Sequence, residues 1–210
     1  MRRIASAVLA CVLVVCNKPS SASDLQLKSA APDHVGLTLQ QSPVLYYFVS
    51  KATALPTRFT LTNADTRDVV ADVVLSSPTT AGFWPIRFKD HGIVLDPGVD
   101  YRWFVRVIRN PDSPSEDLVA GGSIECCPEE LIYLDVPRVC TTDTVFEYAK
   151  NGIWYDTFAC VSELIEAEPN NQKLRRLRDQ LEKDMRGHAH RLEGASTARL
   201  EPRATINIPP

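Results

Sequence analysis

The sequence predicts an α+β fold, with an N-terminal antiparallel, immunoglobulin-like β-sandwich followed by a C-terminal unit of three helices. Short apolar or alternating segments, separated by turn residues, run through residues 35–127 and are typical of an antiparallel sandwich. After Pro128 the apolar residues recur at three and four positions, which indicates amphipathic helices over residues 128–186. The 210 residues are 44% hydrophobic and 23% charged, a composition that favours a globular protein over a disordered one.

Residues 1–22 have the layout of a secretory signal peptide. Arg2 and Arg3 precede an apolar run over residues 4–16, and Ser20 and Ala22 are small residues before a cleavage position. The apolar run is shorter than the about 20 residues that a membrane-spanning helix needs. We therefore expect a periplasmic or secreted protein whose mature chain has no transmembrane segment. The alternative is that this segment is retained as an N-terminal anchor.

The residues after the signal peptide predict a polar linker and then six strands. The linker covers residues 23–34 and contains Pro32. The first strand, over residues 44–49, is apolar on both faces, as expected of a central strand that is covered on both sides. The fourth strand contains Pro85, which restricts it to a sheet edge or a bulge. The second to sixth strands are predicted over residues 57–62, 69–75, 82–88, 101–107 and 119–126.

Two features of the later strands indicate how the sandwich packs. The turn Leu95-Asp96-Pro97-Gly98 precedes Tyr101, an arrangement that resembles the tyrosine corner, in which the tyrosine hydroxyl holds the preceding turn by a hydrogen bond. Alternation places Tyr101 and Trp103 on the buried face of their strand. Gly121 and Gly122 in the last strand indicate a bulge or a close approach of another part of the chain.

Three helices are predicted in the C-terminal unit. The first covers residues 141–150, the second covers residues 153–167, and Asn170 with Asn171 then offers a cap for the third. The last two helices each carry one apolar stripe: Trp154, Phe158, Val161 and Ile165 on the second, and Leu174, Leu177, Leu181 and Met185 on the third. Residues 187–210 show no periodicity, and we expect a disordered tail there.

The order of several short motifs resembles a bacterial family of exported proteins, the domain of unknown function 928, over residues 36–185. The motifs that carry the resemblance are Ser42-Pro43 with Leu45-Tyr46-Tyr47-Phe48-Val49, the Gly82-Phe83 strand, Leu95-x-Pro97-Gly98-x-x-Tyr101-x-Trp103, and Ile153-Trp154-Tyr155-Asp156. The resemblance implies the fold and export, and it supplies no activity and no catalytic residues. The adjacent cysteines Cys126 and Cys127 are not part of the family pattern.

Cleavage of the signal peptide would leave four cysteines in the mature chain, namely Cys126, Cys127, Cys140 and Cys160. An even number of cysteines in an exported protein favours disulfides. Consecutive side chains in an extended strand point to opposite faces, and a bond between neighbours would strain the peptide between them. We therefore expect at least one bridge from Cys126 or Cys127 to Cys140 or Cys160, which would hold the helices on the sandwich. Four reduced and separately buried thiols are the alternative.

No motif in the sequence indicates an enzyme, a cofactor site or a metal site. A dinucleotide-binding glycine motif, a P-loop and a His-Glu-x-x-His helix are all absent. His91 follows Asp90, but no nucleophile elbow accompanies this pair. His188 and His190 lie in the predicted tail, away from any cysteine or carboxylate cluster. We therefore expect a protein that is not an enzyme and that uses no cofactor.

Two functions are consistent with the sequence: a protein-interaction module of the cell envelope and, as the alternative, a carbohydrate-binding module. Tyr46 and Trp84 are the candidate ligand-binding residues, as an aromatic platform for a sugar or a peptide, although aromatic residues of a sandwich also fill its core. The net charge of -3 gives no basis for nucleic-acid binding by the whole protein. The expected partner is therefore an envelope protein or a glycan.

Overall fold

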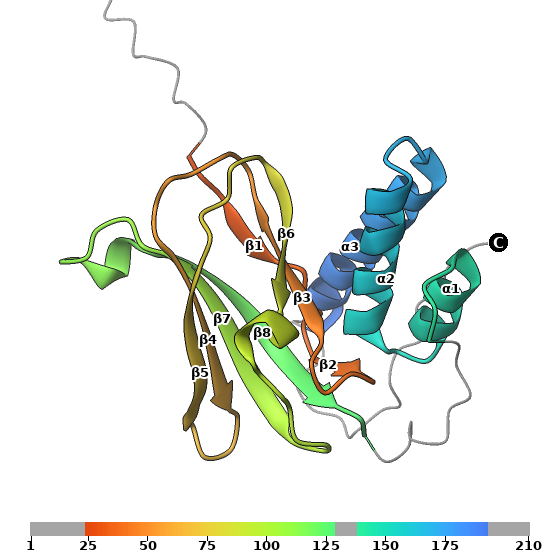
Figure 1. The fold of residues 1–210 in the computed structure, drawn as a ribbon, viewed down its shortest axis with the longest axis horizontal. Coiled ribbons are helices and arrows are strands. Elements are labelled where there is room, and N and C mark those ends of the chain that lie inside the picture. Colours follow the sequence, from red (N-terminus) through yellow and green to blue (C-terminus); the bar gives the residue numbers. More distant parts are fainter. Residues whose placement is uncertain (1–23, 129–137, 193–210) are drawn as a thin grey trace, which may run out of the picture.

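The computed structural model describes residues 24–128 and 138–192, with side chains described as far as residue 183. Two β-sheets and a group of three helices follow one another across the molecule, with the smaller sheet between the larger sheet and the helices (Figure 1). The predicted α+β class is therefore confirmed. The predicted signal peptide over residues 1–22 and residues 193–210 of the predicted tail lie outside the described residues.

The larger sheet has the strand order β2-β8-β7-β4-β5 and is mixed. Strand β2 pairs with β8 in parallel, whereas the other neighbouring strands are antiparallel. The prediction of an antiparallel sandwich is corrected in this respect, because a strand of four residues without a hairpin partner carries no sequence sign of its direction. The strands are β2 (Val35–Thr38), β4 (Thr57–Asn63), β5 (Val69–Leu75), β7 (Asp100–Val107) and β8 (Leu118–Cys126).

The smaller sheet is antiparallel, with the order β1-β3-β6, and consists of β1 (Leu27–Ser29), β3 (Val44–Val49) and β6 (Gly82–Arg87). Strand β3 is central and β6, which contains Pro85, is at an edge, so both predictions are confirmed. The linker predicted over residues 23–34 is wrong, because β1 pairs with β3 and Ala30 is buried. Three strand residues with an exposed lysine at the centre are too few to show an alternation.

The helices are α1 (Thr142–Lys150), α2 (Trp154–Ala167) and α3 (Gln172–Leu192), close to the predicted ranges. The Thr141 side chain accepts a hydrogen bond from the Thr144 amide at the start of α1. The Asn171 side chain caps α3 by accepting hydrogen bonds from the amides of Lys173 and Leu174. Helix α3 extends to Leu192 and so continues beyond residue 187, where the tail was predicted to begin. In the described part of the chain, no helix is long and apolar enough to span a membrane.

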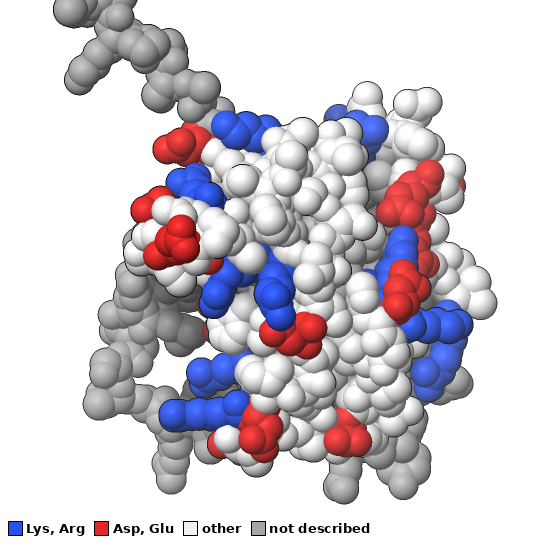
Figure 2. All heavy atoms as spheres, turned by 60° about the vertical axis from the view of Figure 1, so that its left-hand side comes forward, with Lys and Arg blue, Asp and Glu red and all other residues white. Residues whose placement is uncertain are grey.

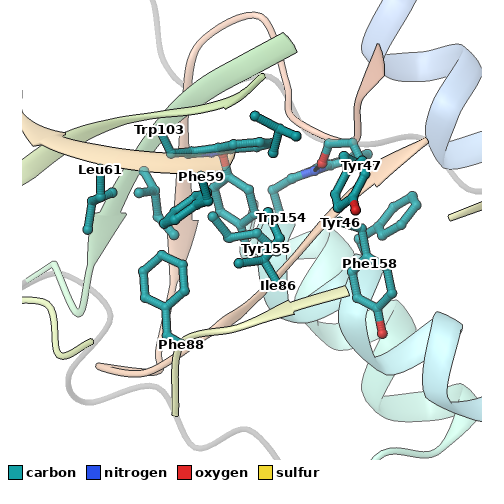
Figure 3. Close-up of a cluster of buried hydrophobic side chains, with 14 of the residues drawn as sticks. Tyr46, Tyr47, Phe59, Leu61, Ile86, Phe88, Trp103, Trp154, Tyr155 and Phe158 are labelled. Carbon is teal, nitrogen blue, oxygen red and sulfur yellow. Dashed lines mark hydrogen bonds between the residues drawn. The ribbon is translucent and has the colours of Figure 1, made fainter. Parts of the chain in front are cut away.

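One hydrophobic core joins both sheets and α2 (Figure 3). Trp103 of β7 is fully buried, and its ring lies 6.4 Å from that of Phe59 and 6.5 Å from that of Tyr155. Phe158 packs against Tyr46 at 5.5 Å on the helix-facing side of the smaller sheet. The C-terminal unit therefore does not fold on a core separate from that of the sandwich. The alternation predicted for Tyr101 and Trp103 is confirmed.

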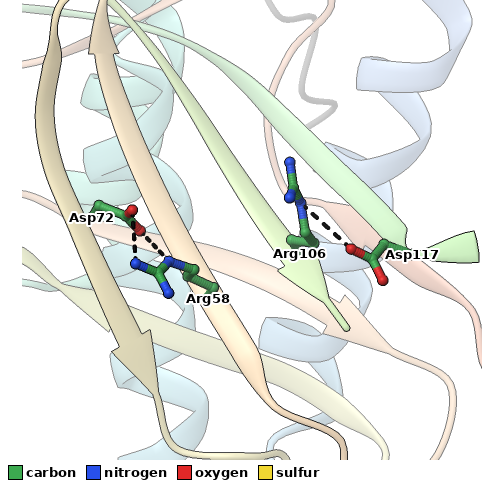
Figure 4. Close-up of polar contacts among 4 residues, drawn as sticks. All are labelled: Arg58, Asp72, Arg106 and Asp117. Carbon is green, nitrogen blue, oxygen red and sulfur yellow. Dashed lines mark hydrogen bonds and ion pairs between the residues drawn. The ribbon is translucent and has the colours of Figure 1, made fainter. Parts of the chain in front are cut away.

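Charged side chains of both signs are interleaved on the face shown in Figure 2, with uncharged surface between them. Two ion pairs on the larger sheet show the pattern (Figure 4). The Arg58 guanidinium donates to both carboxylate oxygens of Asp72 on β5, at 2.5 and 2.9 Å, and Arg106 lies 3.8 Å from Asp117. Each of these pairs places a positive and a negative charge side by side on the larger sheet, so the two charges offset each other there.

Candidate functional site

A cavity of about 640 Å³ lies where the chain crosses from the smaller sheet to the larger one. Phe48 of β3 and Phe83 of β6 provide its aromatic lining, and Ala120 and Gly121 of β8 form another wall. Charged residues also line it, namely Lys28, Asp33 and Glu182. A volume of this size, mainly apolar with a few charged groups, is within the range of ligand-binding pockets.

The aromatic lining of this cavity is held rigidly by α2 and α3. The Phe83 ring lies 5.3 Å from the Phe48 ring and 5.2 Å from the Phe158 ring, the latter in an edge-on arrangement. The Arg178 guanidinium of α3 lies over the Phe83 ring, 4.8 Å from its centroid. Burial lowers the pKa of Arg178 from its ordinary value, although two acidic neighbours on α3 oppose this shift. The aromatic part of the cavity lining is therefore fixed by packed side chains.

Part of one side of strand β8 has no paired strand beside this cavity in the described part of the chain. Strand β2 covers only Ser123–Cys126 of β8, so within the described residues the stretch Leu118–Gly122 has a paired strand on the β7 side alone. Val119 is 53% exposed. Gly122 is closely approached by Ala31, whose Cβ lies 2.4 Å from the position that a side chain on Gly122 would take. Strand β1 packs close to β8 without pairing to it, so Leu118–Gly121 lacks a hydrogen-bonded strand on this side among the residues that the structure describes, and we call this stretch the β8 edge.

Glycines at the end of the β8 edge confirm the predicted close approach. A Cβ atom on Gly121 would lie 2.2 Å from the Trp103 carbonyl oxygen and 2.8 Å from the Phe104 ring. Only a residue without a side chain fits between Phe104 and the cavity at this point. The sequence indicated the close approach but not the cavity, because the cavity depends on Phe48, Phe83 and α3, which are far from β8 along the chain.

The predicted aromatic platform of Tyr46 and Trp84 does not exist. Tyr46 pairs with Pro85 and Tyr47 pairs with Trp84, so Tyr46 and Trp84 point to opposite faces of the smaller sheet. Tyr46 is 2% exposed and packs on Phe158 in the core. Trp84 is half-buried and its indole N–H donates to the Thr80 carbonyl at 3.1 Å. Neither residue lines the larger cavity.

A smaller and more polar cavity of about 240 Å³ lies at the start of α2, around Asp156. The Asp156 carboxylate accepts a hydrogen bond from the Leu39 amide at 3.0 Å and further hydrogen bonds from the Thr38 and Gln40 side chains. Burial raises the pKa of Asp156 above its ordinary value, and these hydrogen bonds oppose the rise. Asp156 therefore attaches α2 to the chain that leaves β2.

Tyr155, the residue before Asp156, is fully buried between the sheets. Its hydroxyl accepts a hydrogen bond from the Trp103 indole at 2.8 Å and donates to the Ser123 carbonyl at 2.9 Å. Burial raises the pKa of this hydroxyl. Tyr155 and Asp156 belong to the Ile153-Trp154-Tyr155-Asp156 motif, which was the sequence signal for this cluster, but the motif alone did not indicate which groups they contact.

All four described cysteines are free thiols in the structure. Cys126 and Cys127 have their Sγ atoms 2.7 Å apart, and Cys140 hydrogen-bonds to Cys160 beside the smaller cavity. No bridge from the first pair to the second is formed. The expectation that Cys126 and Cys127 point to opposite faces is wrong, because Cys127 has a φ of 49° and ends the extended conformation.

The candidate histidines are not part of either cavity lining. His34 and His91 are exposed, and His91 ends the short turn of 3-10 helix Phe88–His91. His188 and His190 lie beyond the residues whose side chains are described. Among the described residues, no group of three His, Cys, Asp or Glu side chains is arranged to hold a metal ion.

The structure defines a class of α+β protein in which two sheets and a helical layer meet around a mainly apolar cavity beside the β8 edge. The family model described as Domain of Unknown Function (DUF928) matches residues 16–189, and the chain belongs to this family. This match confirms the resemblance that the motifs over residues 36–185 indicated. No curated protein matches the sequence.

Proposed function

We propose that this protein is an exported, non-enzymatic envelope protein that binds an extended segment of a partner protein at the β8 edge. The observation that carries the proposal is the position of Leu118–Gly121, which has no paired strand on one side and lies beside a cavity lined by Phe48 and Phe83. Addition of a strand to an open edge gains main-chain hydrogen bonds, and a pocket for alternate side chains provides specificity.

The chemistry of the cavity indicates which segment fits. A strand added to β8 would place every second side chain toward the aromatic lining, so we expect apolar or aromatic residues at those positions. Lys28, Asp33 and Glu182 line the same cavity, so polar or charged residues of either sign at the flanking positions can be accommodated. The second open edge of the larger sheet, β5, has exposed valines but is not among the elements that line the cavity.

The carbohydrate-binding alternative loses the feature on which it depended, because Tyr46 and Trp84 do not share a face. The enzyme alternative would draw on Asp156, which is buried and has a raised pKa. The Asp156 carboxylate accepts hydrogen bonds from the Thr38–Gln40 segment. The residues that line the smaller cavity around it include no histidine or lysine. These observations support an interaction module over both alternatives.

We also propose that the sandwich is a variant of the immunoglobulin-like arrangement, with β2 as an added parallel strand. The support is a tyrosine corner: the Asp96 amide donates to the Tyr101 hydroxyl at 3.1 Å, across the turn that precedes β7.

Two exposed valines provide a matched test of the binding site. A photo-crosslinking amino acid in place of Val119 on β8 should crosslink to a partner in the envelope fraction, whereas the same residue in place of Val74 on β5 should not. Val119→Lys should weaken the complex several-fold, because a lysine on an edge strand opposes strand addition, and Val74→Lys should leave it unchanged.

Hydrogen exchange then distinguishes strand addition from other contacts. In the complex, the amides of Leu118–Gly121 should exchange more slowly than in the protein alone, while those of β5 should be unaffected. Protection on β5, or a partner that crosslinks at Val119 without protecting any β8 amide, would contradict the proposal.

A further inference from the structure

The sulfur atoms of Cys126 and Cys127 lie side by side at the end of β8, 2.7 Å apart. In an extended strand, consecutive side chains point to opposite faces. Cys127 instead adopts the left-handed conformation, with φ at 49°, which is uncommon for a residue with a side chain. This single backbone change turns the Cys127 side chain to the side on which Cys126 lies.

Neighbouring segments hold the two cysteines in this arrangement. The Cys127 amide donates to the Thr38 carbonyl at 2.8 Å, at the end of β2, and the Gly98 amide donates to the Cys126 carbonyl at 2.9 Å. The Cys127 thiol donates to the Leu39 carbonyl at 3.4 Å. The peptide between the two cysteines is therefore attached to other parts of the fold through both its carbonyl and its amide, so the sulfur contact is preorganised.

We propose that Cys126 and Cys127 form a reversible dithiol–disulfide site that exchanges with external disulfides, either of small thiol compounds or of proteins. Cys127, which is half-buried, reacts first, and Cys126, which is fully buried, resolves the intermediate. The two roles follow from access, since an external disulfide can reach only the sulfur that is partly exposed.

The proposed exchange reaction consists of two successive substitutions at sulfur. The Cys127 thiolate attacks one sulfur of the external disulfide, forms a mixed disulfide and releases the first external thiolate. Cys126 then loses its proton and attacks the Cys127 sulfur, which forms the Cys126–Cys127 bond and releases the second external thiolate. The two protons from the cysteines are taken up by the two external thiolates, so the protein loses two electrons and the external disulfide gains them.

Reversibility follows from the covalent distance between neighbours. The Cα atoms of adjacent residues are about 3.8 Å apart across a trans peptide, which is shorter than the roughly 4.4–6.8 Å found in most disulfides. A bond under such strain is reduced more readily than a relaxed structural bridge. Burial also raises the pKa of Cys126, and the adjacent Cys127 and the Asp156 charge act in the same direction.

Trypsin separates the cysteines in a way that identifies their pairing directly. Cleavage after lysine and arginine places Cys126 and Cys127 in the peptide 110–138, Cys140 in the peptide 139–150 and Cys160 in the peptide 151–173. After oxidation of the full chain with a small disulfide and alkylation of the remaining thiols, we expect an unlinked 110–138 peptide that is two hydrogens lighter and carries no label. Reductant should restore both labels together.

Single variants distinguish the two cysteines. Cys126→Ser should accumulate one external thiol per chain as a stable mixed disulfide on Cys127, because the resolving thiol is absent. Cys160→Ser, the matched control, should still form the unlinked 110–138 product. Two labels on the 110–138 peptide after oxidation, a link from it to either other cysteine peptide, or release of the mixed disulfide from Cys126→Ser would each overturn the proposal. The partner-binding function does not enter this test.

Discussion

The indole N–H of Trp103 donates a hydrogen bond to the hydroxyl of Tyr155 at 2.8 Å, and both side chains are buried. The same hydroxyl donates to the Ser123 carbonyl at 2.9 Å, so one phenol group connects β7, β8 and α2. Gly122 makes room for it, because a Cβ atom there would lie 3.2 Å from the Tyr155 hydroxyl. Helix α2 is therefore attached to the larger sheet through the core, and we expect the sheets and α2 to unfold together.

Tyr155→Phe should lower the free energy of unfolding by about 1–3 kcal/mol, because it leaves the Trp103 N–H and the Ser123 carbonyl buried without this partner. Tyr46→Phe is the matched control: the Tyr46 hydroxyl is also buried, but among the described residues it forms no short hydrogen bond like those of Tyr155, and it interacts with the partly exposed side chain of Arg87. Removal of the Tyr46 hydroxyl should change the free energy of unfolding little. Urea unfolding of both variants measures the difference, and equal losses would contradict the role of the Tyr155 hydroxyl.

Trp103→Ala should destabilise the protein by about 3–5 kcal/mol, as expected for the loss of a large buried aromatic side chain. Arg102→Ala, one residue earlier on the exposed face of β7, should cost far less. Urea midpoints for the two variants test the register of β7, and similar midpoints would contradict it.

The features that were predictable from the sequence are those that depend on local patterns. The alternation around Trp103 indicated β7, Pro85 placed β6 at an edge, and the spacing of Trp154 and Phe158 indicated the buried face of α2. Each of these patterns is contained within a few residues, so no knowledge of the tertiary structure was needed.

The missed features depend on contacts between distant segments or on one unusual backbone angle. Strand β1 has three residues and becomes a strand only because β3 lies beside it. The predicted platform of Tyr46 and Trp84 fails because the register of β3 and β6 places the two side chains on opposite faces of the smaller sheet. The contact between Cys126 and Cys127 follows from the left-handed φ of Cys127, and no sequence pattern predicted that backbone conformation. The larger cavity is lined by residues of β1, β3, β6, β8 and α3, so it also had no local sign in the sequence.

The export that we propose predicts a defined mature N-terminus. In a bacterium with a working secretion system, the envelope form of the protein should begin between Ser21 and Asp24, as measured by intact mass and N-terminal sequencing. Leu13→Arg should retain the precursor in the cytoplasm, because a charge interrupts the apolar core of the signal. Envelope protein that still carries Met1 would indicate an uncleaved anchor, and wild-type protein found only in the cytoplasm would contradict export.

Asp156 should make stability depend on pH in a direction opposite to that of an ordinary ion-paired aspartate. Burial raises its pKa in the folded protein, whereas in the unfolded chain it has the ordinary value of about 3.9. The folded state therefore binds the proton more tightly, and the contribution of this group to stability falls as pH rises from about 4 through the raised folded pKa. Asp156→Asn cannot ionise, so it should lack this fall.

Urea unfolding at several pH values from about 3.5 to 8 provides the test of this direction. The free energy of unfolding of the wild type minus that of Asp156→Asn should decrease across this range. Asp112→Asn, in an exposed turn, is the control for the change in net charge and should show a smaller dependence. A difference that grows with pH would mean that the hydrogen bonds from Leu39, Thr38 and Gln40 outweigh burial and that the folded carboxyl is the stronger acid.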